Sequence, residues 1–307
     1  MIQINFFKIE SQVQKLIFPT QEDEIKSILR LQRLKKKEMQ ASFLTLLTAC
    51  LMHQTLPVSL KLFHTLFNAL AKDQKWTEKE DGRFGIVHLP SYPVFVKWYN
   101  RLGPWLEKIV QEKLKDRRIA SINKGSCLMM VDSTLLNINS GKGYTKSLNH
   151  QASLGYSSCG TGYGFKLHML ADALGHPLAV ELSTAKMHDL EGLKLMHQQP
   201  VQPFGIVLAD RGYISKAYYF ELMQKNTILA ARPKDNMENA NNEFWFEYSI
   251  KTWPQKYKKL YKNRQKIEHE FAYLKHRLHL NIQGARALGH VLTKVFSALL
   301  VRLLQIE

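Results

Sequence analysis

The chain has 307 residues, and its 43 Lys and Arg against 26 Asp and Glu give a formal net charge of +17. A hydrophobic fraction of 45% is enough for a packed core, which excludes a mainly disordered chain. The positive excess favours a polyanionic partner, either nucleic acid or an acidic membrane surface.

Membrane insertion and export are not indicated by the sequence. The longest apolar runs, residues 43–52 and 295–301, are far shorter than the roughly 20 residues of a membrane span, so we expect buried helices there. The N-terminus lacks the pattern of a signal peptide. Three scattered cysteines form neither a disulfide framework nor a CxxC zinc site. We therefore expect a cytoplasmic protein with reduced thiols and no membrane partner.

Positive charge is concentrated in two windows. Residues 26–37 carry six Lys and Arg and no acid, and residues 251–280 carry seven Lys and two Arg against two Glu. The first window includes Lys35, Lys36 and Lys37. A lysine run can be simply a solvated helix face, and this alternative stays open for the first window. The other interpretation is a helical DNA-binding region in the first 125 residues, where apolar residues recur at helical spacing over 25–34, 60–70 and 95–110.

After Gly125 the pattern changes to short apolar runs. Residues 127–131 predict a buried strand that ends in Asp132, and residues 205–209 predict another that ends in Asp210. Strands followed by helices, with a hairpin between the two aspartates, indicate a mixed α/β sheet. The remaining predicted elements are the hairpin strands 163–170 and 177–182, helices over 190–197 and 215–224, a strand over 227–231, and helix from 254 onward with a break near Gly284.

A polar stripe borders the apolar face of the helix predicted after residue 254. At about 100° per residue, Tyr261, Arg264, Glu268 and Lys275 fall within an arc of roughly 60°. This stripe presents one carboxylate among two cations and a phenol. The alternative is that Arg264 and Glu268 form only an ordinary surface pair one helical turn apart.

Three carboxylates, Asp132, Asp210 and Glu268, are the side chains that metal-dependent phosphodiester chemistry needs. Two ions about 3.5 to 4 Å apart activate the attacking oxygen and stabilise the leaving oxygen. Hard ions such as Mg²⁺ prefer carboxylate oxygens. Lys and Arg within two turns of Glu268 would hold substrate phosphates, and the Tyr261 hydroxyl could add a contact.

These motifs resemble the DDE transposases of bacterial insertion sequences. The likeness is carried by Tyr261-x2-Arg264-x3-Glu268-x6-Lys275, by Ala209-Asp210-Arg211-Gly212-Tyr213 and by Val131-Asp132-Ser133-Thr134. The pattern on the helix is similar to the insertion-sequence-four-like branch. The helical N-terminal half is similar to one subgroup, insertion-sequence family nine-eight-two.

The resemblance implies an RNase H-like catalytic domain over residues 126–307, preceded by a helical DNA-binding region over residues 1–125. It implies that Asp132, Asp210 and Glu268 hold two Mg²⁺ ions, for which Mn²⁺ can substitute, and that Tyr261, Arg264 and Lys275 hold phosphates. It also implies cleavage at the element's inverted-repeat ends, transfer of the 3′ hydroxyl to target DNA, a synaptic homo-oligomer, and action at the bacterial nucleoid.

Several alternatives remain open from the sequence. Lys166 and His168 lie on one face of the strand expected beside the Asp132 strand, where they either approach DNA or face solvent. His188-Asp189 is expected to open a helix with the acid in a capping role, a catalytic role being the alternative. For the whole chain, the alternatives are an RNase H-like nuclease without strand transfer, or a non-catalytic DNA-binding remnant or repressor.

Overall fold

The structure, a computed structural model, describes residues 36–73, 89–125, 128–138, 151–157, 160–201, 205–231 and 259–306. The chain divides into two compact units. The helical unit comprises residues up to Val110, Leu274–Asn281 and the chain from Ala285, and the sheet unit comprises Gln111–Tyr273 and Ile282–Gly284. The predicted boundary after residue 125 differs from this division, which assigns the last helix to the same unit as the N-terminal helices.

The helical unit contains α3 (Lys36–His53), α4 (Leu60–Asp73), the first half of α5 (Tyr92–Asn123) and α11 (Leu288–Ile306). The helices predicted over residues 60–70 and 95–110 are confirmed as α4 and part of α5, which continues further than the periodicity indicates. The helix predicted over residues 25–34 lies outside the described residues. Lys36 and Lys37 begin α3, but their side chains, like all of Lys35, are not described.

Two glycines bring α5 and α11 into close contact. A Cβ at Gly103 would lie 2.7 Å from the Leu292 Cβ, and a Cβ at Gly289 would lie 2.1 Å from the Asn100 carbonyl oxygen. The Thr293 hydroxyl donates to the Tyr99 carbonyl at 2.6 Å within the same crossing. Among the described helices α11 is the one long and apolar enough to cross a membrane, yet 67% of that stretch is buried inside the protein. It is the buried helix expected at residues 295–301.

The described part of the sheet unit is built on six strands. Their order is β2-β3-β1-β5-β6, with β4 also paired to β3, so that β3 carries β2 and β4 along one edge. β3 is antiparallel to β1, β2 and β4, whereas β1, β5 and β6 run parallel. The strands are β1 (Leu128–Asn137), β2 (Ser153–Ser157), β3 (Gly160–Asp172), β4 (Pro177–Thr184), β5 (Gly205–Ala209) and β6 (Thr227–Ala231).

The sheet confirms the predicted mixed α/β class and the β3–β4 hairpin, and corrects one strand end. Asp132 lies in the middle of β1 and not at its end. The strand continues because β3 pairs with it for five further residues, as far as Asn137 opposite Gly164. β2, a short strand that pairs with the start of β3, was not predicted from the sequence.

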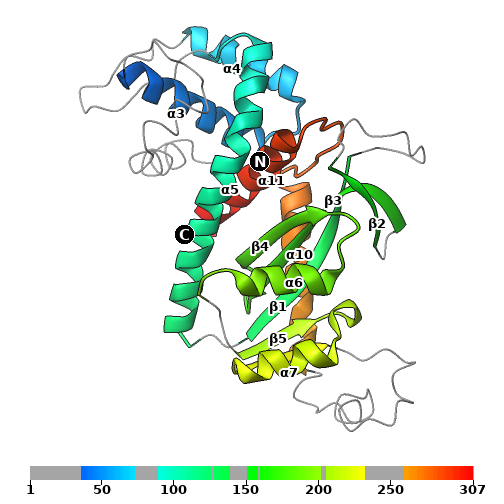
Figure 1. Ribbon diagram of the computed structural model, residues 1–307. Helices are drawn as coiled ribbons and strands as arrows, with labels where there is room; N and C mark the ends of the chain where they lie inside the picture. The colour runs from blue at the N-terminus through cyan, green and yellow to red at the C-terminus, as the bar shows by residue number, and fades with distance from the viewer. Residues whose placement is uncertain are drawn as a thin grey trace. The chain divides into compact units, whose positions relative to one another are not determined.

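Helices cover both faces of the sheet. In Figure 1, α6 (Asp189–Gln198) and α7 (Lys216–Gln224) lie in front of the strands and α10 (Gln265–His276) passes behind them. The core in front is built from alternating residues of β1 and β5, including Met129, Val131, Val207 and Ala209, which pack with Leu193 of α6 and Leu222 of α7. Because side chains alternate along a strand, Asp132 projects to the opposite face, the side of α10.

Candidate active site

Asp132 on β1 and Asp210, directly after β5, lie at equivalent positions in the register of these two neighbouring parallel strands. The β1–β5 ladder pairs Met130 with Leu208, and each aspartate follows its member of that pair by two residues. Asp210 begins the turn η1 (Arg211–Tyr213), where its Oδ1 accepts a hydrogen bond from the Arg211 backbone N–H at 2.7 Å. The parallel register, together with the alternation along each strand, directs both carboxylates to the α10 side.

Arg264 joins the three predicted acids. It lies in the 3-10 turn η3 (Lys262–Arg264), directly before α10. Its Nη2 donates to the Asp132 Oδ2 at 2.9 Å and lies 3.9 Å from the Asp210 Oδ2, while its Nη1 lies 3.4 Å from the Glu268 Oε1. Three segments far apart in sequence therefore converge on one guanidinium group. Arg264 and Glu268 are more than the isolated surface pair left open by the sequence.

The site is closed on one side and open on the other. The Asp132 and Arg264 side chains are 19% and 16% exposed, against 53% for Asp210 and 52% for Glu268. Burial raises the pKa of Asp132, and the carboxylates of Asp210 and Glu268 raise it further, against the opposing effect of Arg264 and the Ser133 N–H. Burial alone would lower the pKa of Arg264, but the surrounding acids, Asp132 foremost, raise it overall. The guanidinium thus remains charged and balances part of the acidic charge.

The donor set fits a hard divalent cation, because it consists of carboxylate oxygens alone. Within the described ranges, no three His, Cys, Asp or Glu side chains stand close enough to hold an ion as they are placed. The Arg264 guanidinium lies among the carboxylates and supplies the positive charge there. A divalent ion bound by the same oxygens would replace it as their counter-charge.

Tyr261 and Lys275, the other two residues of the polar stripe, lie at opposite ends of the segment that contains η3 and α10. Tyr261 is half-buried directly before η3, and its proximity is one of the causes of the raised pKa of Arg264. Lys275 is half-buried in the last turn of α10, among the residues that belong to the helical unit. The 3-10 turn at residues 262–264 interrupts the single regular helix that the spacing predicts.

Lys166 and His168 do not lie at the surface. They sit on β3 opposite Leu135 and Ser133 of β1, so the expected neighbouring strand is confirmed, but they are only 7% and 0% exposed. Their side chains face α6, where the Cβ of an alanine at Gly192 would lie 2.3 Å from the His168 ring. The expectation that these side chains face solvent is therefore wrong, because α6 covers this face of the sheet. Their contact with DNA stays a prediction.

Asp189 is a connecting residue whose contacts the sequence did not indicate. It lies in the first turn of α6, as expected. Its Oδ1 accepts hydrogen bonds from the Ser133 hydroxyl at 2.6 Å and from the Lys166 ammonium at 3.1 Å. The signal available in the sequence was the His188-Asp189 pair, whose acid was assigned to helix capping. The structure adds contacts to two strands.

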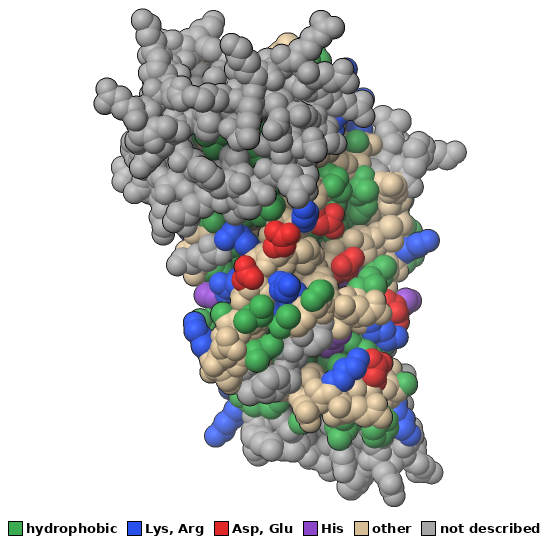
Figure 2. Space-filling view, turned by 60° about the vertical axis from the view of Figure 1, so that its left-hand side comes forward, with side chains coloured by type: hydrophobic (Ala, Val, Ile, Leu, Met, Phe, Trp, Pro, Cys, Tyr) green, Lys and Arg blue, Asp and Glu red, His purple; other side chains and the backbone are tan. Residues whose placement is uncertain are grey.

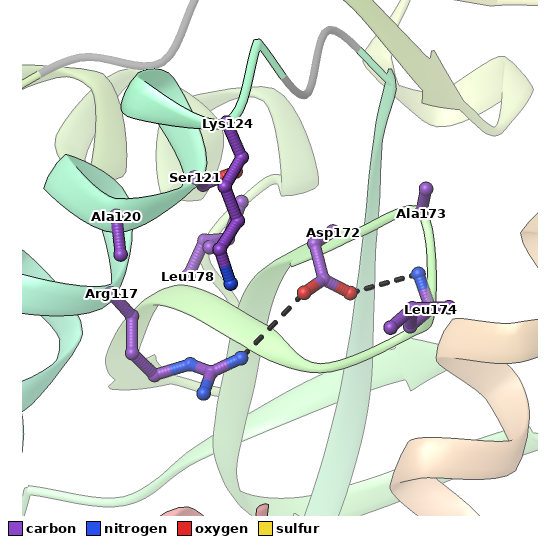
Figure 3. Close-up of a pocket in the computed structure, with 8 residues that line it drawn as sticks. All are labelled: Arg117, Ala120, Ser121, Lys124, Asp172, Ala173, Leu174 and Leu178. Carbon is purple, nitrogen blue, oxygen red and sulfur yellow. Dashed lines mark hydrogen bonds and ion pairs between the residues drawn. The ribbon is translucent and has the colours of Figure 1, made fainter. Parts of the chain in front are cut away.

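A recess of about 210 Å³ lies at the β3–β4 turn, away from the three acids. Figure 3 shows Arg117 of α5 and Lys124, just after that helix, on one side of it and Asp172 and Leu174 on the other. Arg117 donates to the Pro177 carbonyl and lies 3.6 Å from the Asp172 carboxylate, which also accepts from the Leu174 backbone N–H. These contacts fasten the end of α5 to the turn. They pair the charges of Arg117 and Asp172 with each other.

Charge on the described surface is mixed. Figure 2 shows Lys and Arg side chains interspersed with Asp and Glu across the part of one face that is coloured by residue type. The excess of +17 is therefore not spread as a uniform basic layer over that face.

The strand order and the position of the acids define the class of protein. A mixed sheet in which β3 is antiparallel to β1, β2 and β4, while β5 and β6 run parallel to β1, has the RNase H-like order. With carboxylates contributed by β1, by the turn after β5 and by a following helix, it is the fold of a phosphoryl-transfer enzyme. Residues 123–304, more than half of the chain, match the Transposase DDE domain, and the chain belongs to that family. It is accordingly a DNA transposase, and enzymes of this family generally use divalent metal ions. No curated protein matches the chain in sequence.

Proposed function

We propose that Asp132, Asp210 and Glu268 form the metal-binding catalytic triad of this transposase and hold two Mg²⁺ ions, for which Mn²⁺ can substitute. The observation that carries the proposal is the convergence of three acids from β1, β5 and α10 on Arg264. Asp132, the most buried acid, is central and would contact both ions, with Asp210 and Glu268 each completing one side. The ions supply charge stabilisation for the attacking and leaving oxygens.

The substrate is the phosphodiester backbone at the ends of an insertion sequence. In the first step water attacks the phosphorus, the bond to the 3′ oxygen breaks, and the proton lost by water balances the one gained by the released 3′ hydroxyl. In the second step that hydroxyl attacks a target phosphate, forms a new phosphodiester bond and expels the target's own 3′ oxygen. In each step one oxygen on phosphorus replaces another, so the phosphorus keeps four oxygens, and neither step needs an oxidant or a cofactor beyond the cations.

In this scheme Arg264 pairs with the three acids before the ions bind and with a substrate phosphate afterwards. Without ions it neutralises the acids, and with ions and DNA in place its planar fork is free to donate two parallel hydrogen bonds to a phosphate beside the scissile bond. Tyr261 and Lys275 are proposed to contact the flanking phosphates. The 3-10 turn supports this exchange because it places Arg264 at the partly open end of α10, beside the exposed carboxylates of Asp210 and Glu268.

The wider setting is also proposed. The polar pattern from Tyr261 to Lys275 supports membership of the insertion-sequence-four-like branch, and the helical N-terminal part supports family nine-eight-two within it. Work on two ends at once calls for a homo-oligomeric synaptic complex, with the bacterial nucleoid in the cytoplasm as its place of action. Lys35, Lys36 and Lys37 are proposed to contribute DNA contacts from the N-terminal part.

The test is Asp132→Asn assayed on DNA that carries candidate ends, with Mg²⁺ or Mn²⁺. We expect loss of both nicking and strand transfer with DNA binding retained. Asp116→Asn, at an exposed position on α5, is the matched control and should keep activity. Unchanged cleavage by Asp132→Asn would refute the triad. Nicking by the unaltered chain without any joined product would favour the nuclease without strand transfer, and binding without nicking would favour the DNA-binding remnant.

A further inference from the structure

Asp189 lies beside β1 and beside the turn η1, on the face of the sheet opposite to the three acids. Its Oδ1 accepts from the hydroxyl of Ser133, the residue next to Asp132. Its Oδ2 faces Gly212, two residues after Asp210, where a Cβ would lie only 3.3 Å away. One carboxylate therefore reaches both the strand that carries Asp132 and the turn that follows Asp210.

The position of Asp189 is itself held firmly. Lys166, whose side chain is 8% exposed, donates from its ammonium both to the Asp189 Oδ1 at 3.1 Å and to the Met187 carbonyl at 2.9 Å. This buried cation balances the acid and ties the start of α6 to β3. Hydrogen bonds thus join β1 and β3 through the start of α6, which also packs against the turn η1. Such a network is rigid because every member has a charged or hydrogen-bonded partner.

The hydrogen bond between Asp189 and Ser133 affects the proposed metal site because Ser133 cannot move without moving Asp132. The two residues are consecutive on β1, and the Asp132 Oδ1 also accepts from the Ser133 backbone N–H at 2.9 Å. On the other side, η1 begins at Asp210 and packs against α6. Sites of this kind need their ligands held to within about 0.5 Å, and groups behind the ligands supply that precision.

We propose that Asp189 is a positioning residue that sets the spacing between the Asp132 and Asp210 carboxylates and thereby the affinity of the site for divalent ions. The inference rests on the proposed triad and deepens it. Asp189 does not touch the substrate or the ions in this scheme, because it lies on the α6 face of the sheet. A purely local role in the first turn of α6 is the competing explanation.

Glu191 provides a matched control. It is the other acid in the first turn of α6, its side chain is 53% exposed, and it pairs with Lys194 on the same helix. Glu191→Gln removes a first-turn acid without touching β1 or η1. Ser133→Ala removes one hydroxyl donor and leaves Asp189 in place, so it tests the hydrogen bond between the two residues with a smaller change.

The experiment measures Mn²⁺ binding to the full chain by calorimetry, with the free energy of unfolding measured in parallel. We expect Asp189→Ala and Ser133→Ala each to weaken Mn²⁺ binding by about 10- to 100-fold, the usual effect of residues behind metal ligands. Glu191→Gln should change it less than about twofold. The double variant Ser133→Ala/Asp189→Ala should bind Mn²⁺ no more weakly than the worse single variant, because both substitutions remove the same hydrogen bond.

Two outcomes would overturn the inference. Mn²⁺ affinity that stays unchanged in Asp189→Ala and Ser133→Ala, with only stability lowered, would assign Asp189 a local structural role. An equal loss in Glu191→Gln would assign the effect to the helix start. If Asp189→Ala does not fold, Ser133→Ala decides alone. Failure of the proposed triad is distinguished separately, because Asp132→Asn would then bind Mn²⁺ as well as the unaltered chain does.

Discussion

Arg264 donates a hydrogen bond to Asp132 at 2.9 Å across 132 positions of sequence. The contact connects the turn before α10 to the middle of β1, and both side chains are mostly buried. It is the shortest of the three ion pairs that gather the predicted triad. A cation of the protein itself therefore holds these acids together when they have no other counter-charge.

Replacing Arg264 should destabilise the metal-free protein. Arg264→Ala leaves the mostly buried Asp132 without its cation and near two other acids, which we expect to cost about 1 to 3 kcal/mol of unfolding free energy. Mg²⁺ or Mn²⁺ should restore part of that loss. Urea unfolding with and without the ions measures both effects. Lys262→Ala, at an exposed position of the same turn, is the control, and an equal loss in that variant would contradict the role of Arg264.

Buried histidines should make the protein less stable in mild acid. Burial lowers the pKa of His168 to about 4, and it lowers the pKa of His197 and His290 to about 4 as well. Because the unfolded chain binds these protons near pH 6.5 and the folded chain does not, stability is fully present above pH 6.5 and falls as pH drops toward 4.

Substitution of His168 should reduce this pH dependence. We expect the difference in unfolding free energy between pH 7.5 and pH 5 to be smaller in His168→Gln than in the unaltered chain, whatever the absolute stability of the variant. The exposed His276→Gln should leave the difference as it is. An identical pH dependence in His168→Gln and the unaltered chain would show that His168 does not contribute.

The close crossing of α5 and α11 should not tolerate a side chain. In Gly103→Ala the new Cβ would lie 2.7 Å from the Leu292 Cβ and 2.8 Å from the Gly289 carbonyl oxygen, so the helices must separate. We expect a loss of about 1 to 3 kcal/mol, typical of overpacking. Thermal unfolding measures it. Lys115→Ala, exposed on the same helix, should change stability by less than about 0.5 kcal/mol. A Gly103→Ala protein as stable as that control would contradict the tight crossing.

The N-terminal lysines should determine part of the salt dependence of DNA binding. Replacement of Lys35, Lys36 and Lys37 by Gln should flatten the plot of log affinity against log salt concentration, by about 0.9 for each phosphate that the variant no longer neutralises. Filter binding or fluorescence anisotropy over a range of salt concentrations measures the slope. Lys61→Gln on α4 is the control at an exposed position. A slope that does not change would assign the three lysines to a solvated surface.

Short-range patterns were sufficient for most of the sheet unit. The run that became β5, the hairpin of β3 and β4, and the helix α6 were predicted within a few residues of their observed bounds, because alternating or helical apolar spacing reports which face is buried. The end of β1 was misplaced because its continuation depends on pairing with β3, a contact distant in sequence.

The site was predicted in its composition but not in its connections. The order of Asp132, Asp210 and Glu268 along strand, strand and helix was visible in the sequence. Their common contact with Arg264 depends on the parallel register of β1 and β5 and on a 3-10 turn, neither of which periodicity reports. Lys166 was misjudged for the same reason, since only the packing of α6 decides which face of β3 is covered.

The helical unit takes its parts from both ends of the chain, because α11 packs with α3 and α5 after the whole sheet unit has intervened. A ribosome therefore delivers the first helices long before the final one. During synthesis the sheet unit is complete before α11 emerges. Until then, the residues of the N-terminal helices that pack against Val295 and Leu299 have no partner from α11. Removal of α11, which has 19 residues, would then destabilise the N-terminal helices. A fragment that ends between the sheet unit and α11 would have a helical unit without one side of its core.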